Sequence, residues 1–164
     1  MPIITSKVRK AGWSDDAEIR AMMWDGYLEH EFFQPSEARI QEMCRKAFDR
    51  DGAIIGAIGP VGAVESIIYL AITQFEYTDE WCLCEVHNYV RPEFRRTSNA
   101  KDMIDFGKRC SEELGLRLVI GVVSNERTKA KMELYRRRLG EPAGGYFVWP
   151  PKPVQSPAIG LETA

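Results

Sequence analysis

Histidine and cysteine are scarce in this sequence, and their positions argue against a metal site. The chain of 164 residues has two histidines and four cysteines, Cys44, Cys82, Cys84 and Cys110, with no Cys-x-x-Cys pair. A zinc site needs clustered ligands of these types, which the sequence does not offer. Cys82 and Cys84 are two residues apart on one expected strand, too close for an easy disulfide. We therefore expect reduced, buried thiols and no bound metal.

An excess of charge of one sign and long apolar runs are also lacking. The 22 basic residues nearly balance the 24 acidic ones, for a net charge of −2. General nucleic-acid binding needs a broad basic face, which this composition does not supply. No segment approaches a membrane span, and the N-terminus lacks the apolar stretch of a signal peptide. We expect a cytoplasmic protein that binds neither nucleic acid nor membrane.

Length and apolar content fit one domain with a real core. Apolar residues make up 45% of the chain, and no internal repeat divides it. We expect a single domain over residues 1–149. The Pro-rich residues 150–164 form a tail, either loosely ordered or clasped to a partner chain in a homodimer.

The apolar pattern of the N-terminal half predicts a short strand, two helices and a hairpin. The strand covers residues 7–11, and Ser14 is the expected N-cap of the first helix. A second helix begins at Pro35-Ser36. The segment Gly59–Gly62 is a turn between two strands rather than a nucleotide loop, since no helical pattern follows it. The buried face of the first helix is expected to hold Ile19, Met22, Met23, Gly26 and Tyr27.

A strand over residues 81–90 leads into the most informative stretch of the chain. By alternation Leu83, Glu85, His87 and Tyr89 share one face, unless a bulge intervenes. A polar loop with two arginines follows, and then a helix with apolar residues at helical spacing. Exposed amides and the positive end of the helix dipole favour an anion at such a junction. Phosphate is the natural candidate.

The loop carries a family resemblance. The stretch from Val90 to Ala100 (VRPEFRRTSNA) resembles the acetyl-CoA pyrophosphate loop of the GNAT superfamily of N-acetyltransferases. Arg95 takes the Gln/Arg position of that motif and Ala100 the final small one. Ser98 replaces the first glycine, which leaves less room but adds a hydroxyl donor and a helix N-cap.

A second stretch resembles the other hallmark of the family. In residues 125–140 Asn125 opens the last helix, Tyr135 lies within it, and Leu-Gly follows. The spacing from Asn125 to Tyr135 is about one turn longer than in many members. Glu141 stands where Phe is usual. The general character of the sequence is also similar to small GNAT-like proteins of bacteriophages.

The resemblance implies both a fold and a cosubstrate. The implied fold is mixed α/β (α+β), a mostly antiparallel mixed sheet flanked by about four helices. Two of its neighbouring strands splay apart, so that the pantetheine arm of acetyl-CoA enters between them. The cosubstrate is acetyl-CoA, and no metal is implied. The cofactor-binding residues implied are Val90, Arg95, Arg96, Thr97, Ser98, Asn99, Ala100 and Asn125.

Two residues are the catalytic candidates. An amine acceptor must lose a proton, and Glu85 is the first candidate to take it; His87 is the second. Glu85 also resembles the base of many GNAT enzymes; the alternative is a carboxylate at the sheet rim, paired with an arginine. Tyr135 would assist departure of the CoA thiolate. Its alternative role is packing with Met132 and Leu139.

Acceptor contacts are less defined in the sequence. In the resemblance the loop between the first two helices lines the acceptor site, so Phe32 and Phe33 either contact substrate or belong to the core. Arg136–Arg138 either form a solvated helix end or contact the 3′-phosphate of CoA. A strand over residues 117–123 and a last edge strand over 142–149 complete the expected elements.

Two functions stay open at this point. The first is an N-acetyltransferase that transfers acetyl directly from acetyl-CoA to a primary amine of a small molecule or peptide. The second is a catalytically inactive GNAT-like scaffold that serves as a binding or structural protein.

Overall fold

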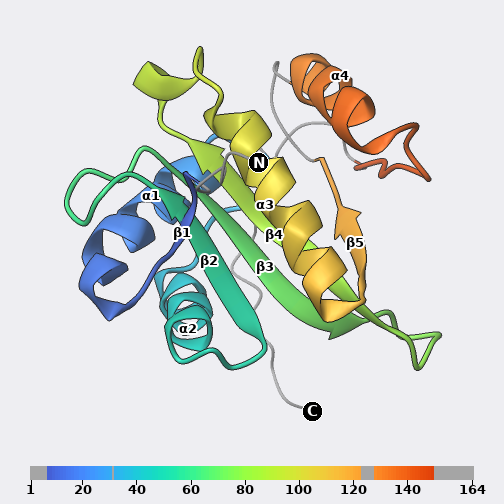
Figure 1. Cartoon of the computed structure of the whole chain (residues 1–164), viewed down its shortest axis with the longest axis horizontal. Coiled ribbons are helices and arrows are strands. Elements are labelled where there is room, and N and C mark those ends of the chain that lie inside the picture. The colour runs from blue at the N-terminus through green and yellow to red at the C-terminus, as the bar shows by residue number, and fades with distance from the viewer. Residues whose placement is uncertain (1–6, 31, 123–127, 150–164) are drawn as a thin grey trace, which may run out of the picture.

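A computed structural model describes residues 7–30, 32–122 and 128–149 of the chain, and Figure 1 shows its elements in order. Short 3-10 turns at Trp13–Asp15 and Pro92–Phe94 precede α1 and α3. The helices and strands are β1 (Arg9–Lys10), α1 (Asp16–Leu28), α2 (Glu37–Phe48), β2 (Ala53–Ile58), β3 (Ser66–Gln74), β4 (Trp81–Val90), α3 (Asn99–Leu114), β5 (Arg117–Ile120) and α4 (Thr128–Leu139).

The five strands form one sheet in the order β1-β2-β3-β4-β5. The first three pairings are antiparallel, and β4 pairs with β5 in parallel. A parallel pair of consecutive strands needs a crossover connection, and α3 supplies it. The expected mixed, mostly antiparallel sheet is therefore confirmed.

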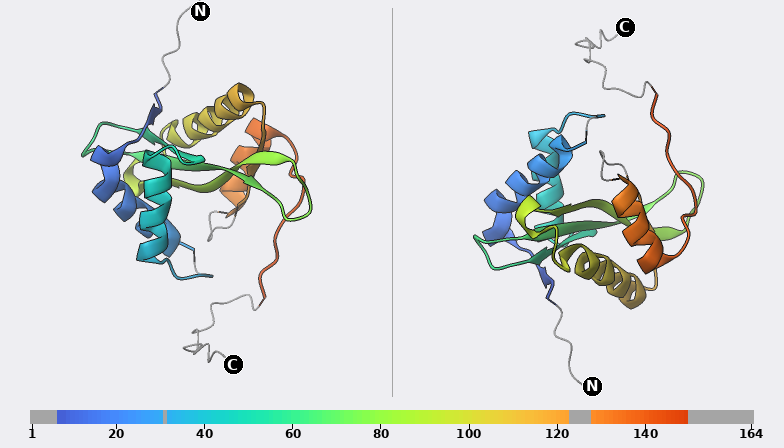
Figure 2. Two further views of the ribbon diagram at one scale, coloured as in Figure 1. Left: turned by 90° about the horizontal axis from the view of Figure 1, so that it is seen from below. Right: turned by 90° about the horizontal axis from the view of Figure 1, so that it is seen from above.

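Helices cover both faces of this sheet. In Figure 2, α1 and α2 lie on one side of the sheet and α3 lies on the other. Strand β3 is central and apolar on both faces, as expected, because Ile67 and Tyr69 belong to the core on the α1/α2 side while Ile68 and Leu70 belong to the core beneath α3. The α1/α2 core also buries the predicted face of α1, Ile19, Met22 and Met23.

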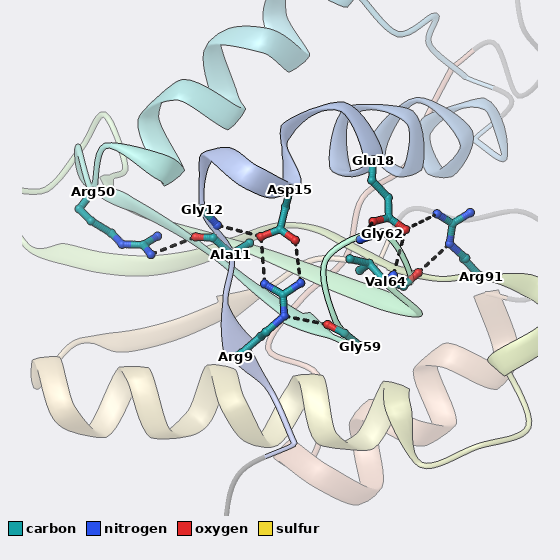
Figure 3. Close-up of polar contacts among 10 residues, drawn as sticks. All are labelled: Arg9, Ala11, Gly12, Asp15, Glu18, Arg50, Gly59, Gly62, Val64 and Arg91. Atoms are coloured by element: carbon teal, nitrogen blue, oxygen red, sulfur yellow. Dashed lines mark hydrogen bonds and ion pairs between the residues drawn. The ribbon is translucent and has the colours of Figure 1, made fainter.

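The start of the chain is fixed by an ion pair between Arg9 and Asp15 (Figure 3). The Arg9 guanidinium donates to both Asp15 oxygens, at 2.7 and 2.9 Å, and the Gly12 amide donates to the same carboxylate. This carboxylate is 1% exposed, and the guanidinium holds its pKa below the usual range. The prediction that Ser14 caps α1 was wrong, because the helix starts after a 3-10 turn with Asp15 at the N-cap position.

Two other local predictions are confirmed. The second helix was expected to begin at Pro35-Ser36, and α2 starts directly after Ser36, whose Oγ accepts a hydrogen bond from the Arg39 amide at 3.4 Å. The turn between β2 and β3 places Gly59 at φ 98° and Gly62 at φ 84°, a left-handed backbone that favours glycine.

The last edge strand predicted over residues 142–149 was wrong. These residues form no strand, and the side chains of Tyr146, Phe147 and Trp149 are largely exposed. Their aromatic composition suits a strand, but Gly144 and Gly145 weaken one. The predicted strands at 7–11 and 117–123 are shorter than expected, and the predicted tail at 150–164 lies outside the described residues.

The four cysteines are free thiols, as expected, but only Cys44 and Cys82 are buried, whereas Cys84 and Cys110 are partly exposed. No group of metal-ligating side chains occurs among the described residues. Of the helices described here, none has the length and apolarity required to cross a bilayer.

Candidate functional site

The central feature of the site is the point where β4 and β5 part. Their parallel pairing runs from Cys82 opposite Arg117 to Glu85 opposite Ile120, and no pair follows among the described residues. Strand β4 itself continues to Val90, paired on its other side with β3. Residues 86–90 therefore have one unpaired backbone edge within the described structure. This is the parting of neighbouring strands that the sequence comparison implied.

A β-bulge coincides with the parting. Tyr69 pairs with His87 and Leu70 pairs with Glu85, so Val86 is an extra residue in β4. The side chain of Leu83 consequently lies in the core beneath α3, whereas that of Tyr89 lies in the core on the α1/α2 side. The shared face was expected unless a bulge intervenes; the bulge is present and interrupts the alternation, so Leu83 and Tyr89 lie on opposite faces.

The loop after β4 is clamped to the turn between β2 and β3 (Figure 3). Glu18 of α1 accepts hydrogen bonds from the amides of Gly62 and Val64, each at 2.9 Å, and from the Arg91 guanidinium at 3.2 Å. Arg91 also donates through Nε to the Val64 carbonyl at 2.7 Å. The start of the loop is therefore held by a three-way contact that includes a helix from the far N-terminal part of the chain.

The other end of the loop is held by Asn99, the first residue of α3. Its buried amide group donates to Glu65 at 2.8 Å and its oxygen accepts from Lys7 at 2.7 Å. Ser98 stands at the N-cap position, but its hydroxyl donates to Asp102 at 2.7 Å and makes no capping bond. The expectation that Ser98 caps the helix through its side chain was therefore wrong.

Arg95 is engaged inside the protein. It donates through Nε to the Val90 carbonyl at 2.9 Å and forms an ion pair with Glu29, and its guanidinium lies 5.6 Å from the Tyr89 ring centroid. Arg96 and Thr97, in contrast, are exposed, and Ala100 lies in the first turn of α3. The Thr97 hydroxyl donates to the Phe94 carbonyl at 2.6 Å and accepts from the Asn99 amide at 3.2 Å.

Glu85 is buried where the two strands part. It is 8% exposed, and burial raises the pKa of its carboxyl to about 8, opposed by the nearby Lys131 ammonium. A carboxylate with such a pKa is a much stronger base than an exposed glutamate. The alternative of a surface carboxylate paired with an arginine does not describe this side chain, since none of the ion pairs among described residues includes it.

His87 follows Glu85 on β4, across the bulge, and is a weak base. The imidazole is buried, and its ring centroid lies 4.3 Å from that of Tyr27 on α1. Burial lowers its pKa to about 3. Its Nε2 has no hydrogen-bond partner among the described residues, which is rare for a buried polar atom.

Tyr135 of α4 is close to the same carboxylate. Burial first and Glu85 second raise the pKa of its phenol well above the usual range, while the side chain of Asn88 is hydrogen-bonded to it. The same two causes raise the pKa of Tyr27 to about 12. Glu85 is therefore near enough to a tyrosine of α1 and a tyrosine of α4 to influence both, and both phenols are neutral near neutral pH.

Sequence reasoning placed Tyr27 only on the buried face of α1 and gave Asn88 no role. The bulge at Val86 had no glycine or proline to indicate it. Of the other candidates, Phe33 is 73% exposed, which argues against the core interpretation for this residue, and Phe32 is half-buried. Asn125 lies outside the described residues.

Comparisons with known proteins identify the fold. No protein-family model matches the chain, and no curated protein matches its sequence. A predicted acetyltransferase from Clostridium acetobutylicum, solved with acetyl-CoA, is 13% identical over 86% of this chain and 93% of its own, with a TM-score of 0.69. An integron cassette protein from the Cole Harbour salt marsh metagenome is 18% identical over 97% of this chain and 98% of its own, with a TM-score of 0.69.

An aminoglycoside N-acetyltransferase solved with a bisubstrate analogue containing CoA is 15% identical over 87% of this chain and 95% of its own, with a TM-score of 0.67. Identities this low establish architecture rather than activity. The chain has the GNAT acetyltransferase fold, which confirms the expected architecture.

Proposed function

We propose that this protein is an N-acetyltransferase that transfers the acetyl group of acetyl-CoA directly to a primary amine. The observation that carries the proposal is the open edge of β4, which begins beside the buried Glu85 and leads to the N-terminus of α3. An unpaired strand edge offers amide and carbonyl groups to an extended ligand. A helix N-terminus offers amides to a phosphate.

In this proposal residues 86–90 hold the pantetheine arm by backbone hydrogen bonds. The exposed Arg96 and Thr97 and the first-turn amides near Ala100 hold the pyrophosphate, and Asn125 is a further cofactor-binding residue in this proposal. Arg95 supports the loop from inside, because its contacts with Val90 and Glu29 fix the backbone between β4 and α3. Ser98 and Asn99 shape the first turn in the same way.

Glu85 serves as the base. Its raised pKa of about 8 brings it near that of an alkyl ammonium, which favours proton transfer from the acceptor amine. His87, with its pKa lowered to about 3, takes little part as a base and instead fixes the ring of Tyr27. Tyr135 donates a hydrogen bond or proton to the departing thiolate, since its phenol stays protonated across the working pH range.

The acceptor in this proposal is a small-molecule amine, with a peptide amine as the other class. The aminoglycoside N-acetyltransferases among the structural relatives support the first class. The exposed Phe33, in the connection between α1 and α2, offers an apolar contact for the acceptor.

We also propose that residues 1–149 form one domain and that the protein is cytoplasmic. It would be similar to the small GNAT-like proteins of bacteriophages. Residues 150–164 would contact a second copy of the chain in a homodimer. The exposed aromatic residues at 146–149 support contact with another chain.

The alternative function is an inactive GNAT-like binding or structural protein. Two observations favour it. Arg95 is committed to Glu29, and the Asp102 carboxylate lies in the first turn of α3, where a phosphate would be repelled. The two functions differ in whether acetyl-CoA binds and whether an amine is consumed.

The first experiment is a calorimetric titration with acetyl-CoA and with dephospho-CoA, followed by CoA-release assays on a panel of amines. Micromolar binding that weakens in Arg96→Ala supports the cofactor site. CoA release that falls at least about a hundredfold in Glu85→Gln, without loss of acetyl-CoA binding, supports the base. Absence of binding at millimolar acetyl-CoA contradicts the acetyltransferase function and favours the inactive binding or structural protein.

A further inference from the structure

A hollow lies beside the C-terminal half of α3, whereas the loop after β4 leads into the N-terminus of this helix. It has a volume of about 430 Å³ and lies between the C-terminal half of α3 and the ends of β2 and β3. Its floor is apolar and consists of Ile54, Leu70, Ile72 and Leu83. The α3 residues that line it begin at Phe106 and end at Leu114, so its middle lies roughly 16 Å along the helix axis from Asn99.

The packing of α3 explains why this space is left open. Phe106 lies directly on β2, where a Cβ at Gly56 would come within 2.7 Å of the ring. The next turn of the helix presents Cys110 to the hollow, and this small side chain does not fill it. Ile72 on the floor and Leu114 are 37% and 51% exposed, so apolar surface faces solvent. A ligand that covers this surface gains from its removal from water.

The rim of the hollow is positively charged. Lys10, Arg50 and Arg109 line it, and Glu113 is the acidic residue among the lining side chains. The Arg50 guanidinium donates to the Ala47 carbonyl at 2.7 Å and to the Ala11 carbonyl at 3.0 Å, and Figure 3 shows the second of these bonds. Carbonyl partners orient the group but leave its charge in place.

No ion pair among the described residues involves Lys10 or Arg50. The backbone of Arg50 is also unusual, with φ at 59° in the left-handed region. The two carbonyl contacts hold the guanidinium beside Ala11 and the C-terminal end of α2, so its positive charge has a fixed place next to the hollow.

We propose that this hollow binds an amphipathic monoanion, a carboxylate on an aliphatic chain. The chain lies on the floor formed by Ile54, Leu70 and Ile72, and the carboxylate lies at Lys10 and Arg50. The hollow matches the usual form of ligand sites, which measure roughly 300–1,000 Å³ and combine apolar walls with a few placed polar groups. The excess of basic over acidic side chains at the rim selects an anion. The proposal does not depend on acetyl transfer.

Decanoate is the probe that tests this site, titrated below its micelle concentration and followed by calorimetry and by amide NMR shifts. Decanol and decylamine carry the same chain without the negative charge. We expect decanoate to bind at least about tenfold more tightly than either, as expected for a charge-assisted contact. Equal binding of decylamine, or no decanoate binding up to millimolar concentration, overturns the proposal.

Variants locate the probe within the protein. Lys10→Glu is expected to weaken decanoate binding at least about tenfold, whereas Lys46→Glu, the same exchange at an exposed position on α2, leaves it unchanged. Ile72→Glu places a like charge on the floor and should abolish binding, and Ile72→Ala should weaken it if the glutamate variant does not fold. If Lys10→Glu and Lys46→Glu bind decanoate with equal affinity, the carboxylate does not lie at Lys10 and the proposal is overturned.

A competition experiment separates this hollow from the proposed acetyl-CoA site. Saturating acetyl-CoA is expected to leave decanoate affinity unchanged, with shifts confined to β2, β3 and the second half of α3. Displacement of decanoate by acetyl-CoA shows instead that the probe occupies the gap between β4 and β5, and it overturns the proposal. Failure of acetyl-CoA to bind contradicts the proposed acetyltransferase function but does not affect the proposal that the hollow binds a carboxylate.

Discussion

Gly26 of α1 lies directly against the imidazole of His87 on β4. A Cβ at this glycine would come within 2.6 Å of both Nε2 and Cε1 of the ring, and within 3.0 Å of Tyr89. No side chain fits there while the ring keeps its place. The contact lets α1 approach the bulged part of β4, and it brings Tyr27 onto the imidazole and close to Glu85.

The first prediction concerns this contact. Gly26→Ala forces the buried ring to move, at a cost of about 1–3 kcal/mol for overpacking, which a helix-propensity gain of about 1 kcal/mol partly offsets. We expect a net loss in the free energy of unfolding, measured by urea denaturation. Gly12→Ala is the control, because nothing lies within 4 Å of a Cβ at Gly12. Equal stability of the two variants contradicts the close contact.

A second prediction follows from the burial of Glu85. Its pKa is about 8 in the folded protein and near 4.5 when exposed, so the folded state prefers the protonated form. The stability that this group contributes is therefore fully present below about pH 4.5 and is lost as pH rises to 8. Glu85→Gln stays neutral, and we expect its stability relative to the parent chain to increase over this range.

Urea midpoints at several pH values between 4.5 and 8.5 measure this difference. Glu76→Gln is the matched control, since Glu76 is exposed in the connection between β3 and β4. A difference between Glu85→Gln and the parent chain that does not change with pH shows that Glu85 is ionised throughout, and this result removes the basis for its role as a tuned base.

Some features of the structure could be predicted from the sequence alone. Prediction succeeded where residues close together in the sequence determine the local structure. The second helix begins next to Pro35-Ser36, Gly59 and Gly62 supply the turn, and β3 is apolar on both faces. The parallel crossover from β4 to β5 followed from the strand–helix–strand order, whereas the parting of these strands followed from the family resemblance alone.

Features that depend on contacts between residues far apart in the sequence were not predicted. Asp15 rather than Ser14 stands at the start of α1, because an ion pair with Arg9 on β1 fixes it. The bulge at Val86 depends on how β3 pairs with β4, and alternation within one strand cannot reveal it. The segment at 142–149 has the composition of a strand, but a strand also needs an edge to pair with, which composition does not supply.

The third prediction concerns the clamp that holds the loop after β4. Glu18 accepts hydrogen bonds from two backbone amides of the β2–β3 connection and from Arg91. Glu18→Ala leaves these donors without their acceptor, and hydrogen bonds to a charged group contribute about 1.5–3 kcal/mol. We expect a loss of this size in the free energy of unfolding, against no change in the exposed control Glu76→Ala. A loss no larger than that of the control shows that the clamp is not stabilising.

The fourth prediction distinguishes the two proposed functions at the start of α3. Asp102 lies in the first turn of this helix, where its carboxylate accepts from Ser98 at 2.7 Å and lies 3.6 Å from the Lys7 ammonium. A carboxylate at a helix N-terminus uses the same dipole and amides that a phosphate would use. If acetyl-CoA binds at this turn, removal of the negative charge strengthens binding.

Asp102→Asn keeps the size of the side chain and removes its charge, so it is the variant of choice. We expect several-fold tighter acetyl-CoA binding at low ionic strength, with a gain that shrinks as salt is added, because the Debye length falls to about 8 Å at 0.15 M. Glu112→Gln, an exposed change in the last turn of the same helix, should leave affinity unchanged. Equal affinities for Asp102→Asn and the parent chain at every salt concentration place the pyrophosphate away from this turn. An absence of binding in both favours the inactive scaffold, because the repulsive carboxylate is then not what prevents binding.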